Sequence, residues 1–579
     1  MKVVSDKFKE VMNQVVRPTS QFQASLEMFD RSVSRDATVI SSETMPYSTG
    51  VFDVAHEGDY ATFERDFLEV GSKLRICPDN GYIKNGYVSS VACDENGVFQ
   101  QIPIIEFTFT QPRQFIAMTY EFSLDYPTEI RVTYFLNGEE QGQFRSFPTG
   151  VNFVDSDNHI YECDRVTFEF LKLSEPHHRL RISKMVFGYE KIFNMDSVIS
   201  VDHTLSVDPI SSSLSQENLK LSVNNLDKDY NPDNPQGIWT YFTNGLPFSI
   251  RYGIRTDDAV EWVEAGRLVL SDAPTVDGTS ASFEATDVLS SLTDNYNKGV
   301  WNADGTNLYD LAVDVLEDAG VTDYILPDSL KNIVTMSPMP ILPHKECLQI
   351  IANASECVLY TNAQGYIVIE KQIHDATPVD YHLDFEKMFE KPIVKKSELL
   401  KSVDVSVHSL KVSSEETEIC KQEKVTVEDE KEIQIMYDCA TDVKAYVIGG
   451  FLKSANYYAH TAFLKISATS DVTIIAKGYA ITDDTSVVST KVNDQGEVCP
   501  VDNPLITDTA RAERVGKWVG EYLKSRNSYD MDVRQDFILD VNDVIRVRSN
   551  FEDDIPARVT KLQFKLPGQQ GAVSLRRVK

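Results

Sequence analysis

The sequence predicts a mainly β fold with a small α/β module, and three observations support this. Its 579 residues correspond to roughly three to five domains. Apolar and polar residues alternate through most of the chain in short runs bounded by turn residues, as they do in β-strands. Only a few stretches repeat apolar residues at helical spacing. Hydrophobic residues make up 42% of the chain and charged residues 25%, so the chain can bury several cores.

Residues 1–48 are predicted to contain a helix and the start of a first β domain. The helix follows from apolar residues at helical spacing, namely Val4, Phe8, Val11 and Val15. It should end near Pro18. Residues 22–40 alternate in polarity and are predicted to form two strands around a turn at Asp30 and Arg31.

Residues 49–190 contain short strands at near-regular spacing, such as IPIIEFTFT and DRVTFEFLKL. Turn signals such as Asn137-Gly138 separate them, and the pattern is typical of a jelly-roll-like β-sandwich. Alternation resumes over 191–295, which we assign to the remainder of the first β domain. Because β patterns lie on both sides, we expect the sandwich to be an insertion in that domain.

Residues 296–375 are predicted to form a small helical α/β domain. Apolar residues repeat at helical spacing over 307–320, and Gly320 supplies a C-terminal stop. A second helix is predicted over 344–356. A hairpin should follow, with its turn at 362–365.

The rest of the chain divides into three predicted parts. Residues 376–412 begin a second β domain, 413–500 are an inserted β region, and 501–579 close the second domain with a helix and strands. The helix spans about 507–525, with Asp508 near its start. Its apolar stripe contains Val515, Trp518, Val519, Tyr522 and Leu523. We expect this stripe to be buried against the closing strands.

The net charge of −32 results from 56 Lys and Arg against 88 Asp and Glu. A surface this negative repels phosphate backbones, which argues against sequence-specific DNA binding. The eight cysteines show no C-x-x-C pair, which favours folding in a reducing compartment. The first residues mix charged and apolar side chains, unlike a signal peptide. No apolar run approaches the roughly 18 residues needed to cross a bilayer.

Motifs for nucleotide, zinc and serine-hydrolase chemistry are absent. We therefore predict no enzyme activity, no catalytic residue and no cofactor. The pair His177-His178 could suggest a metal site, but neighbours on a strand point to opposite faces, so a surface turn after Pro176 is the better interpretation.

Two acidic segments also resemble ion sites. The cluster Asp155, Asp157, His159 and Cys163 is interpreted as a polar loop that leads into a strand. The segment 227–231 places two aspartates and an asparagine like the first ligands of a calcium loop, but Pro232 stands where that loop needs glycine. Ile238 also replaces the bidentate Glu, so a proline-braced turn is favoured and no metal is assigned.

The 49–190 sandwich could bind carbohydrate through exposed aromatic rings. All four tryptophans lie beyond it in the sequence. Tyrosines would have to serve as the stacking surface, and the candidates are Tyr60, Tyr82 and Tyr87. The alternative for this sandwich is a structural or protein-contact role.

Three stretches together resemble the tail hub, or tail-tip baseplate, proteins of bacteriophages and related contractile injection particles. The first is SVNNLDKDYNPDNP with Tyr241, Gly245, Pro247 and Arg251, followed by VEAGRLVLSDAP and SFEATDVLSSL. The second is DLAVDVLEDAGV with ECLQIIANASECVLYTNAQGYIVIE. The third is NPLITDTARAERVGKWVGEYLKSRNSYDMDVRQDFILDVNDVIRV. Residues 190–375 and 500–575 carry this likeness, and the two inserts do not.

The resemblance implies tube-like β-barrel domains, two per chain, in a homotrimer whose six barrels continue a sixfold tail tube. Its implied partners are distal tail and tail tube proteins, a tape measure protein and a tip or spike protein. DNA would pass through the lumen without specific binding, and genome ejection and host attachment would be the context. The expected location is the virion tail, assembled in the host cytoplasm.

Two other functions stay open from the sequence. The first is a carbohydrate-binding adhesion component of the tail tip that uses the 49–190 sandwich to recognise a host cell-surface glycan. The second is a cell-wall hydrolase, although no peptidase-like or lysozyme-like C-terminal domain is visible. Glycan-array binding tests the former, and cell-wall zymography tests the latter.

Overall fold

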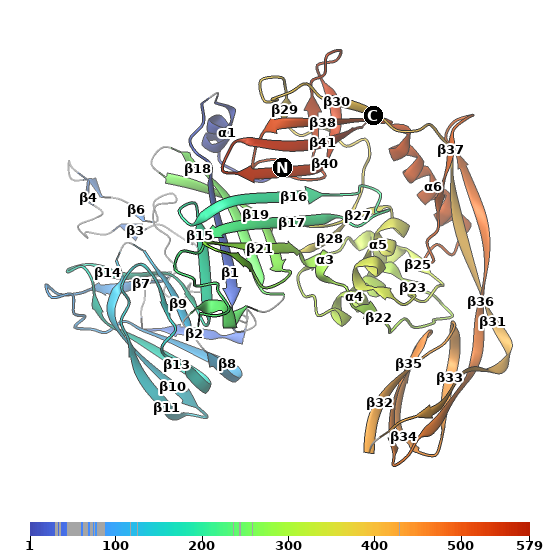
Figure 1. Cartoon of the computed structure of the whole chain (residues 1–579), viewed down its shortest axis with the longest axis horizontal. Helices are drawn as coiled ribbons and strands as arrows, with labels where there is room; N and C mark the ends of the chain where they lie inside the picture. The colour runs from blue at the N-terminus through green and yellow to red at the C-terminus, as the bar shows by residue number, and fades with distance from the viewer. Residues whose placement is uncertain are drawn as a thin grey trace. The chain divides into compact units, whose positions relative to one another are not determined.

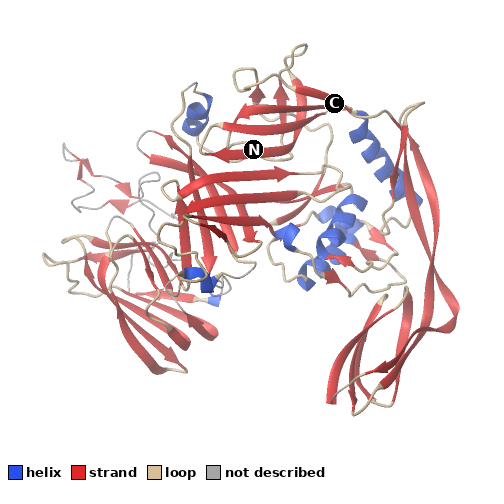
Figure 2. Cartoon of the chain, in the orientation of Figure 1, coloured by secondary structure: helices blue, strands red, loops and turns tan. Residues whose placement is uncertain are grey.

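The computed structural model confirms a mainly β protein with few helices (Figure 2). It describes residues 1–14, 16–28, 33, 36–42, 60–61, 68–69, 73–74, 76–77, 87–115, 117–123, 125–234, 237–242, 245–256, 259–427 and 429–578. The chain divides into two compact units. Unit 1 contains residues 1–4, 198–224 and 263–579, and unit 2 contains residues 5–197 and 225–262.

A wide sheet forms the frame of unit 1 (Figure 1). Its strand order is β19-β21-β17-β16-β40-β41-β38-β30. The bounds are β16 Val198–Ser206, β17 Gln216–Asn224, β19 Ala259–Leu270, β21 Ser280–Asp287, β30 Ile393–Lys396, β38 Asn527–Arg534, β40 Ile555–Leu566 and β41 Gln570–Arg577. Short strands β20 (Thr275–Asp277), β29 (His382–Leu383) and β39 (Val544–Val547) pair at its margins.

Antiparallel pairing of β16 with β40 joins two regions that are far apart in the sequence. Val201 lies opposite Leu566, and Ser206 lies opposite Lys561. The predicted first and second β domains therefore share one sheet. Its described strands follow one another in an open order.

The central strands of this sheet alternate between a buried apolar face and an exposed polar face, as the pleat requires. In β16, Val201 and Leu205 are buried, whereas Asp202 and Thr204 are partly exposed. The closing strands β40 and β41 show the same alternation, with Phe564 buried. The apolar face supplies the core of the sheet, and the polar face is left for solvent or a partner.

The small α/β domain contains three α-helices, one of them a single turn, together with a 3-10 helix, a hairpin and several short strands. The bounds are α3 Val288–Ser291, β22 Asn295–Tyr296, β23 Thr306–Asn307, α4 Leu308–Asp318, β24 Tyr324–Ile325, η3 Asp328–Asn332, β25 Val334–Thr335, β26 Leu342–Pro343, α5 His344–Ala354, β27 Cys357–Thr361 and β28 Ile367–Lys371. Asn307 caps α4 by accepting the N–H of Asp310. Gly365 has a φ of 83° in the hairpin turn, a conformation that favours glycine.

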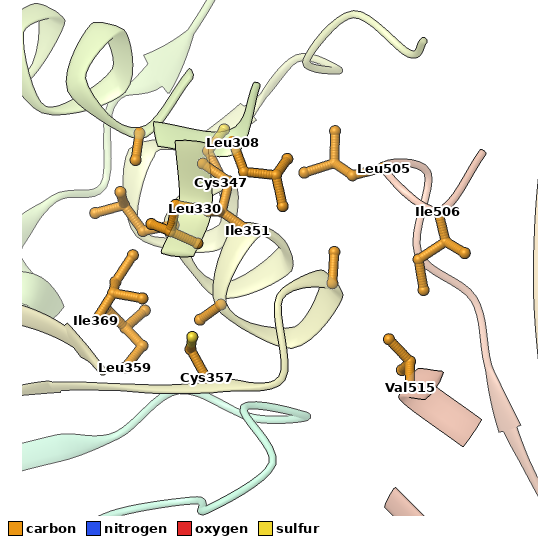
Figure 3. Close-up of a cluster of buried hydrophobic side chains, with 14 of the residues drawn as sticks. Leu308, Leu330, Cys347, Ile351, Cys357, Leu359, Ile369, Leu505, Ile506 and Val515 are labelled. Carbon is orange, nitrogen blue, oxygen red and sulfur yellow. The ribbon is translucent and has the colours of Figure 1, made fainter. Parts of the chain in front are cut away.

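The two predicted helices bury the residues that their spacing assigned to the core. A continuous cluster of buried side chains in this domain includes Leu308, Leu330, Cys347, Ile351, Cys357, Leu359, Ile369, Leu505, Ile506 and Val515 (Figure 3). It extends to helix α6 (Thr509–Lys524), so the α/β domain and this helix share one core.

The helix α6 matches the predicted 507–525 within two residues, and its N-cap is Asp508. Burial of its apolar stripe is confirmed, since Trp518 is 6% exposed and Val519 is 1% exposed. The predicted packing partner is only partly right, because the helix lies mainly against β31 (Leu400–Val425) and β36 (Val472–Lys491). Tyr522 of its stripe also contacts a closing strand, since the Arg576 guanidinium of β41 lies 4.4 Å from its ring centroid. Two glycines of α6 allow this close approach, as a Cβ at Gly516 would lie 2.6 Å from a hydroxyl of β36.

The region 400–501 is built on a long two-stranded ladder of β31 and β36. The other strands are β32 Asp429–Met436, β33 Ala440–Ile448, β34 Phe451–Tyr457, β35 Thr461–Ala468 and β37 Glu497–Val501. They form two sheets, β33-β36-β31-β37 and β32-β35-β34, around a separate apolar core. Strand β31 runs through the predicted boundary at 412/413 without a break, with Val407 in the core shared with α6 and Ile419 packed against this separate core. Strand alternation alone could not show where a domain ends.

Unit 2 contains a β-sandwich with an aromatic core. One sheet has the order β11-β10-β13-β8-β2 and the other β12-β9-β14-β7. The bounds are β2 Thr38–Ser41, β7 Tyr87–Ala92, β8 Ile104–Phe115, β9 Met118–Phe122, β10 Pro127–Leu136, β11 Glu139–Ser146, β12 Asn152–Asp155, β13 Ile160–Leu173 and β14 Arg179–Val186. Short strands β3 Tyr60–Ala61, β4 Leu68–Glu69, β5 Lys73–Leu74 and β6 Ile76–Cys77 pair separately.

Strand β1 (Gln21–Met28) pairs with β15 (Tyr189–Asn194) and β18 (Pro247–Thr256). The predicted start of the sandwich at residue 49 is wrong, because β2 already pairs with β8 in the sandwich. The two strands predicted over 22–40 therefore belong to different sheets, and the turn predicted at Asp30 and Arg31 lies outside the described residues.

The N-terminal helix α1 (Asp6–Asn13) is shorter than predicted. Ser5 is its N-cap, and Phe8 and Val11 are buried as expected. The helix ends at Asn13 instead of near Pro18, and Val15 lies outside the described residues. A 3-10 helix, η2 (Ile238–Tyr241), completes unit 2.

Candidate functional site

The exposed side of the wide sheet in unit 1 is the leading candidate for a functional surface. We call it the polar sheet face. It consists of the outward side chains of six neighbouring strands, including Ser282, Glu284, Lys220, Ser222, Ser200, Asp202, Gln563, Lys565, Gln570 and Asp532. Period-two alternation places all of them on one side of the sheet.

Charges of opposite sign face one another across four strands of the polar sheet face. Glu284 lies opposite Lys220, Lys220 opposite Asp202, and Asp202 opposite Lys565. The Lys220 Nζ and Glu284 Oε1 atoms are 2.7 Å apart, and both side chains are more than 60% exposed. An ion pair this exposed adds little to stability. The alternating charges therefore matter mainly because they determine which charged molecules the surface binds.

Amide side chains satisfy the other carboxylates of this face. The Gln563 Nε2 donates to Asp202 Oδ1 at 2.8 Å, and the Gln570 Nε2 donates to Asp532 Oδ2 at 2.9 Å. Two hollows of about 500 Å³ lie on the face and share Lys565 in their walls. Binding of a phosphate backbone requires clustered cations, and the four-strand charge pattern separates Lys220 from Lys565 by a carboxylate.

A buried ionisable pair lies on the opposite, apolar side of the same strands. The His203 Nε2 and Glu217 Oε1 atoms are 2.8 Å apart, and the two side chains are 0% and 6% exposed. Burial lowers the pKa of His203 to about 3 and raises the pKa of Glu217 well above its ordinary 4.5. Both shifts disfavour the charged form of each group.

A second buried carboxyl, Asp287, holds this region together. It accepts the backbone N–H of Glu217 at 2.8 Å and that of Ser290 at 2.7 Å. Burial raises the pKa of Asp287, and these hydrogen bonds oppose the rise. The pair His203–Glu217 was missed from the sequence. Burial of both residues could have been predicted, because each occupies an inward position of a strand whose residues alternate between apolar and polar.

The structure does not support a sugar site built from the three predicted tyrosines. Tyr87 is 0% exposed and belongs to the aromatic core of the sandwich, so its ring cannot stack on a surface sugar. The prediction for Tyr87 is therefore wrong, because its strand β7 turns that side chain inward. Tyr60 lies in β3, and Tyr82 lies outside the described residues.

The two histidines at 177–178 play different parts. His177 has a φ of 64° in a turn after Pro176, as a surface turn requires. His178 is 7% exposed, and its Nδ1 lies 2.7 Å from Asp125 Oδ2. That buried pair could not be predicted, because Asp125 lies 53 residues away in the sequence.

The acidic segments form ordinary loops. Asp155 accepts the backbone N–H and side-chain N–H of Asn158, and Cys163 is buried. In the 227–231 segment, the N–H of Tyr230 donates to the Asn225 side chain. Within the described ranges, no group of three or more His, Cys, Asp or Glu side chains is arranged to hold a metal.

No helix in the described part of the chain is long and apolar enough to cross a membrane.

The solved structures to which the chain is similar include tail proteins, each with a low TM-score. The 43 kDa tail protein of prophage MuSo2 from Shewanella oneidensis is 10% identical, with 67% of this chain and 96% of that chain covered and a TM-score of 0.36. The tail protein from Neisseria meningitidis MC58 is 8% identical, with 67% and 93% covered and a TM-score of 0.37. Prophage tail protein gp18 from Listeria monocytogenes EGD-e is 8% identical, with 67% and 91% covered and a TM-score of 0.38. No family model and no curated protein matches the sequence.

Proposed function

We propose that this chain is a structural protein of a phage tail or a related particle. Its copies form a trimeric ring at the distal end of the tail tube, where the ring joins the tube to the tip and DNA passes through. The observation that carries the proposal is the polar sheet face, a broad, charge-balanced surface of paired ions, amides and serines.

A conduit for DNA has to be wettable without holding phosphate. The polar sheet face meets the first requirement through its exposed serines and ions. It meets the second because carboxylates separate its lysines across the strands. The face itself is close to charge balance, so the bulk charge of −32 is not what would keep DNA from binding there.

The sequence resemblance supports the tail assignment, since its segments occur in the expected order and include strands of this sheet. The implied partners are the distal tail and tail tube proteins, the tape measure protein and the tip or spike protein. Contact with them requires no catalytic residue, and the proposed role is structural.

The first test is an image of the assembled particle. Threefold symmetry is expected at the layer that contains this protein. Sixfold or twofold symmetry at that layer would contradict the trimer.

The second test changes the charge of the polar sheet face. In the double variant Asp202→Lys with Glu284→Lys, four cations follow one another across the sheet. This variant should retard duplex DNA in a gel at low salt, and the retardation should disappear as salt is raised. The matched control is Asp202→Asn with Glu284→Gln, which should not retard DNA. Binding of duplex DNA by the unmodified chain at physiological salt would contradict the conduit role.

A second candidate function is carbohydrate binding by the sandwich. Tyr161 and Phe147 expose 68% and 58% of their surface, which leaves aromatic rings available on this part of the chain. Tyr161→Ala in the full chain should abolish glycan-array signals if the sandwich is an adhesion module. An array without any signal from the unmodified chain would reject this candidate.

A further inference from the structure

A fully exposed phenylalanine stands on a braced loop at one end of β40. The loop 548–554 joins β39 to β40, and Phe551 is 99% exposed. The Ser549 N–H donates to the Glu552 carbonyl at 2.8 Å, and the Glu552 N–H donates to the Ser549 hydroxyl at 3.1 Å. Arg577 contacts the Glu552 carboxylate through two nitrogens at 3.0 Å each. A loop held in this way loses little entropy when its aromatic ring is bound.

A hollow of about 500 Å³ lies at the other end of the same strand. The turn between β40 and β41 forms part of its wall, together with Phe389, Lys565 and Ala572. Phe389 is 53% exposed, and Ile393 on the adjoining edge strand β30 is 60% exposed. The edge of the polar sheet face near β30 therefore exposes apolar side chains, whereas the rest of the face is polar.

Phe551 and the hollow lined by Phe389 cannot meet within one chain. Strand β40 runs from Ile555 to Leu566, and 11 steps of about 3.3 Å separate its ends by roughly 36 Å. A contact between the two features therefore has to join different molecules. Because it would use two different surfaces, it is a head-to-tail contact of the kind that generates rings or filaments.

We propose that Phe551 of one copy inserts into the Phe389 hollow of a second copy of this chain. The inference deepens the proposed ring and rests on it. Asp553 and Asp554 follow Phe551 and are more than 70% exposed, and each also contacts its own chain, at Arg548 Nε (3.0 Å) and His382 Nε2 (3.4 Å) respectively. They would approach the exposed Lys565 in the wall of the hollow. The aromatic pair supplies the apolar anchor and the charges set its orientation.

Sedimentation of the full-length chain at up to about 1 mM tests the contact. Phe551→Ala and Phe389→Ala should each raise the dissociation constant of self-association roughly 30-fold, as loss of a central anchor does. The matched control is Phe451→Ala, which removes another phenylalanine that is 77% exposed, at the start of β34. The control should leave the dissociation constant unchanged.

A cross-link identifies the two surfaces directly. Chains with Phe551→Cys are mixed with chains with Gln569→Cys, since Gln569 lines the hollow. A disulfide between these positions, located by mass spectrometry, is expected between copies and not within one copy. The proposal fails if the unmodified chain stays monomeric over the whole range, or if all three alanine variants associate alike.

Particle assembly separates the failure of this contact from the failure of the tail role. If Phe551→Ala chains enter tails and complete the ring, the contact is refuted while the tail role stands. If the unmodified chain associates through Phe551 but is absent from tails, the tail role is refuted while the contact stands.

Discussion

Replacement of Trp518 by alanine should be among the most damaging single changes in unit 1. Its side chain is 6% exposed in the core shared by α6 and the α/β domain. Its indole Nε1 donates to the Gln372 carbonyl at 3.2 Å, and the ring of His374 stacks on it at a centroid distance of 5.4 Å. The variant therefore loses both packing and a buried hydrogen bond.

The magnitude follows from these two losses. Truncation of a buried tryptophan to alanine costs about 3 to 5 kcal/mol through lost burial and the remaining cavity. The unsatisfied carbonyl of Gln372, itself 5% exposed, adds about 1 kcal/mol or more. Trp518→Phe separates the terms, because it keeps most of the packing and removes only the donor, so it should cost about 1 to 3 kcal/mol.

Hydrogen exchange of the full chain is the appropriate assay, since a protein of several domains does not unfold in one two-state step. In Trp518→Ala, the free energy of exchange protection in peptides from α6 and β31 should fall by about 3 to 5 kcal/mol from lost packing and about 1 kcal/mol or more from the unsatisfied carbonyl. Lys517→Ala changes an exposed neighbour on the same helix and should alter protection by less than about 0.5 kcal/mol. Equal loss of protection in the two variants would refute the assignment of this stripe to the core.

Three further changes test the packing and electrostatics of unit 1. Gly516→Ala should lower the stability of α6 by about 1 to 3 kcal/mol in the same exchange assay, because its new methyl group collides with β36. Arg511→Met should cost about 3 kcal/mol in the same exchange assay, since it removes a partner of the largely buried Glu356 carboxylate. The contribution of the pair His203–Glu217 to exchange protection of β16 should be level between pH 4.5 and 6.5 and fall by up to about 1.4 kcal/mol per pH unit on either side, beside the separate fall with rising pH that the raised pKa of Asp287 adds. The double variant with leucine at both positions should lose those slopes.

The sign of that pH dependence follows from proton counts. Below pH 4.5 the unfolded chain binds protons on both His203 and Glu217, while the folded chain binds only the one on Glu217, so stability falls as pH falls toward 3. Above pH 6.5 the unfolded pair binds none and the folded pair still binds one, so stability falls as pH rises. Between these values both states bind one proton, and the contributions cancel.

Helices were the most predictable elements of the chain. The apolar repeats of α4, α5 and α6 identify their buried faces, because a helical face is determined by residues three and four positions apart. The partner of α6 could not be predicted in the same way. Its neighbours β31 and β36 begin more than 100 and about 35 residues before it in the sequence, and nothing local in the stripe distinguishes them from the closing strands.

The candidate site was less predictable because it depends on pairing between distant strands. Alternation shows that Asp202 and Lys565 each point away from a core, but only the β16–β40 pairing places them opposite one another, 363 positions apart. The prediction for Tyr87 failed for a related reason. A single tyrosine does not indicate which face of a sheet it occupies until the pairing of its strand is known.

The same pleat that makes the sheet stable also makes its polar face available for function. Neighbouring residues of β16 serve opposite purposes, with His203 buried against the core and Asp202 in the exposed charge pattern. A shift of one residue in the β16–β40 register would exchange these roles and bury charges without partners, at a cost of several kcal/mol. Correct pairing of β16 with β40 is therefore the event that creates both the core and the polar sheet face. Changes that weaken this pairing should remove stability and the proposed conduit together.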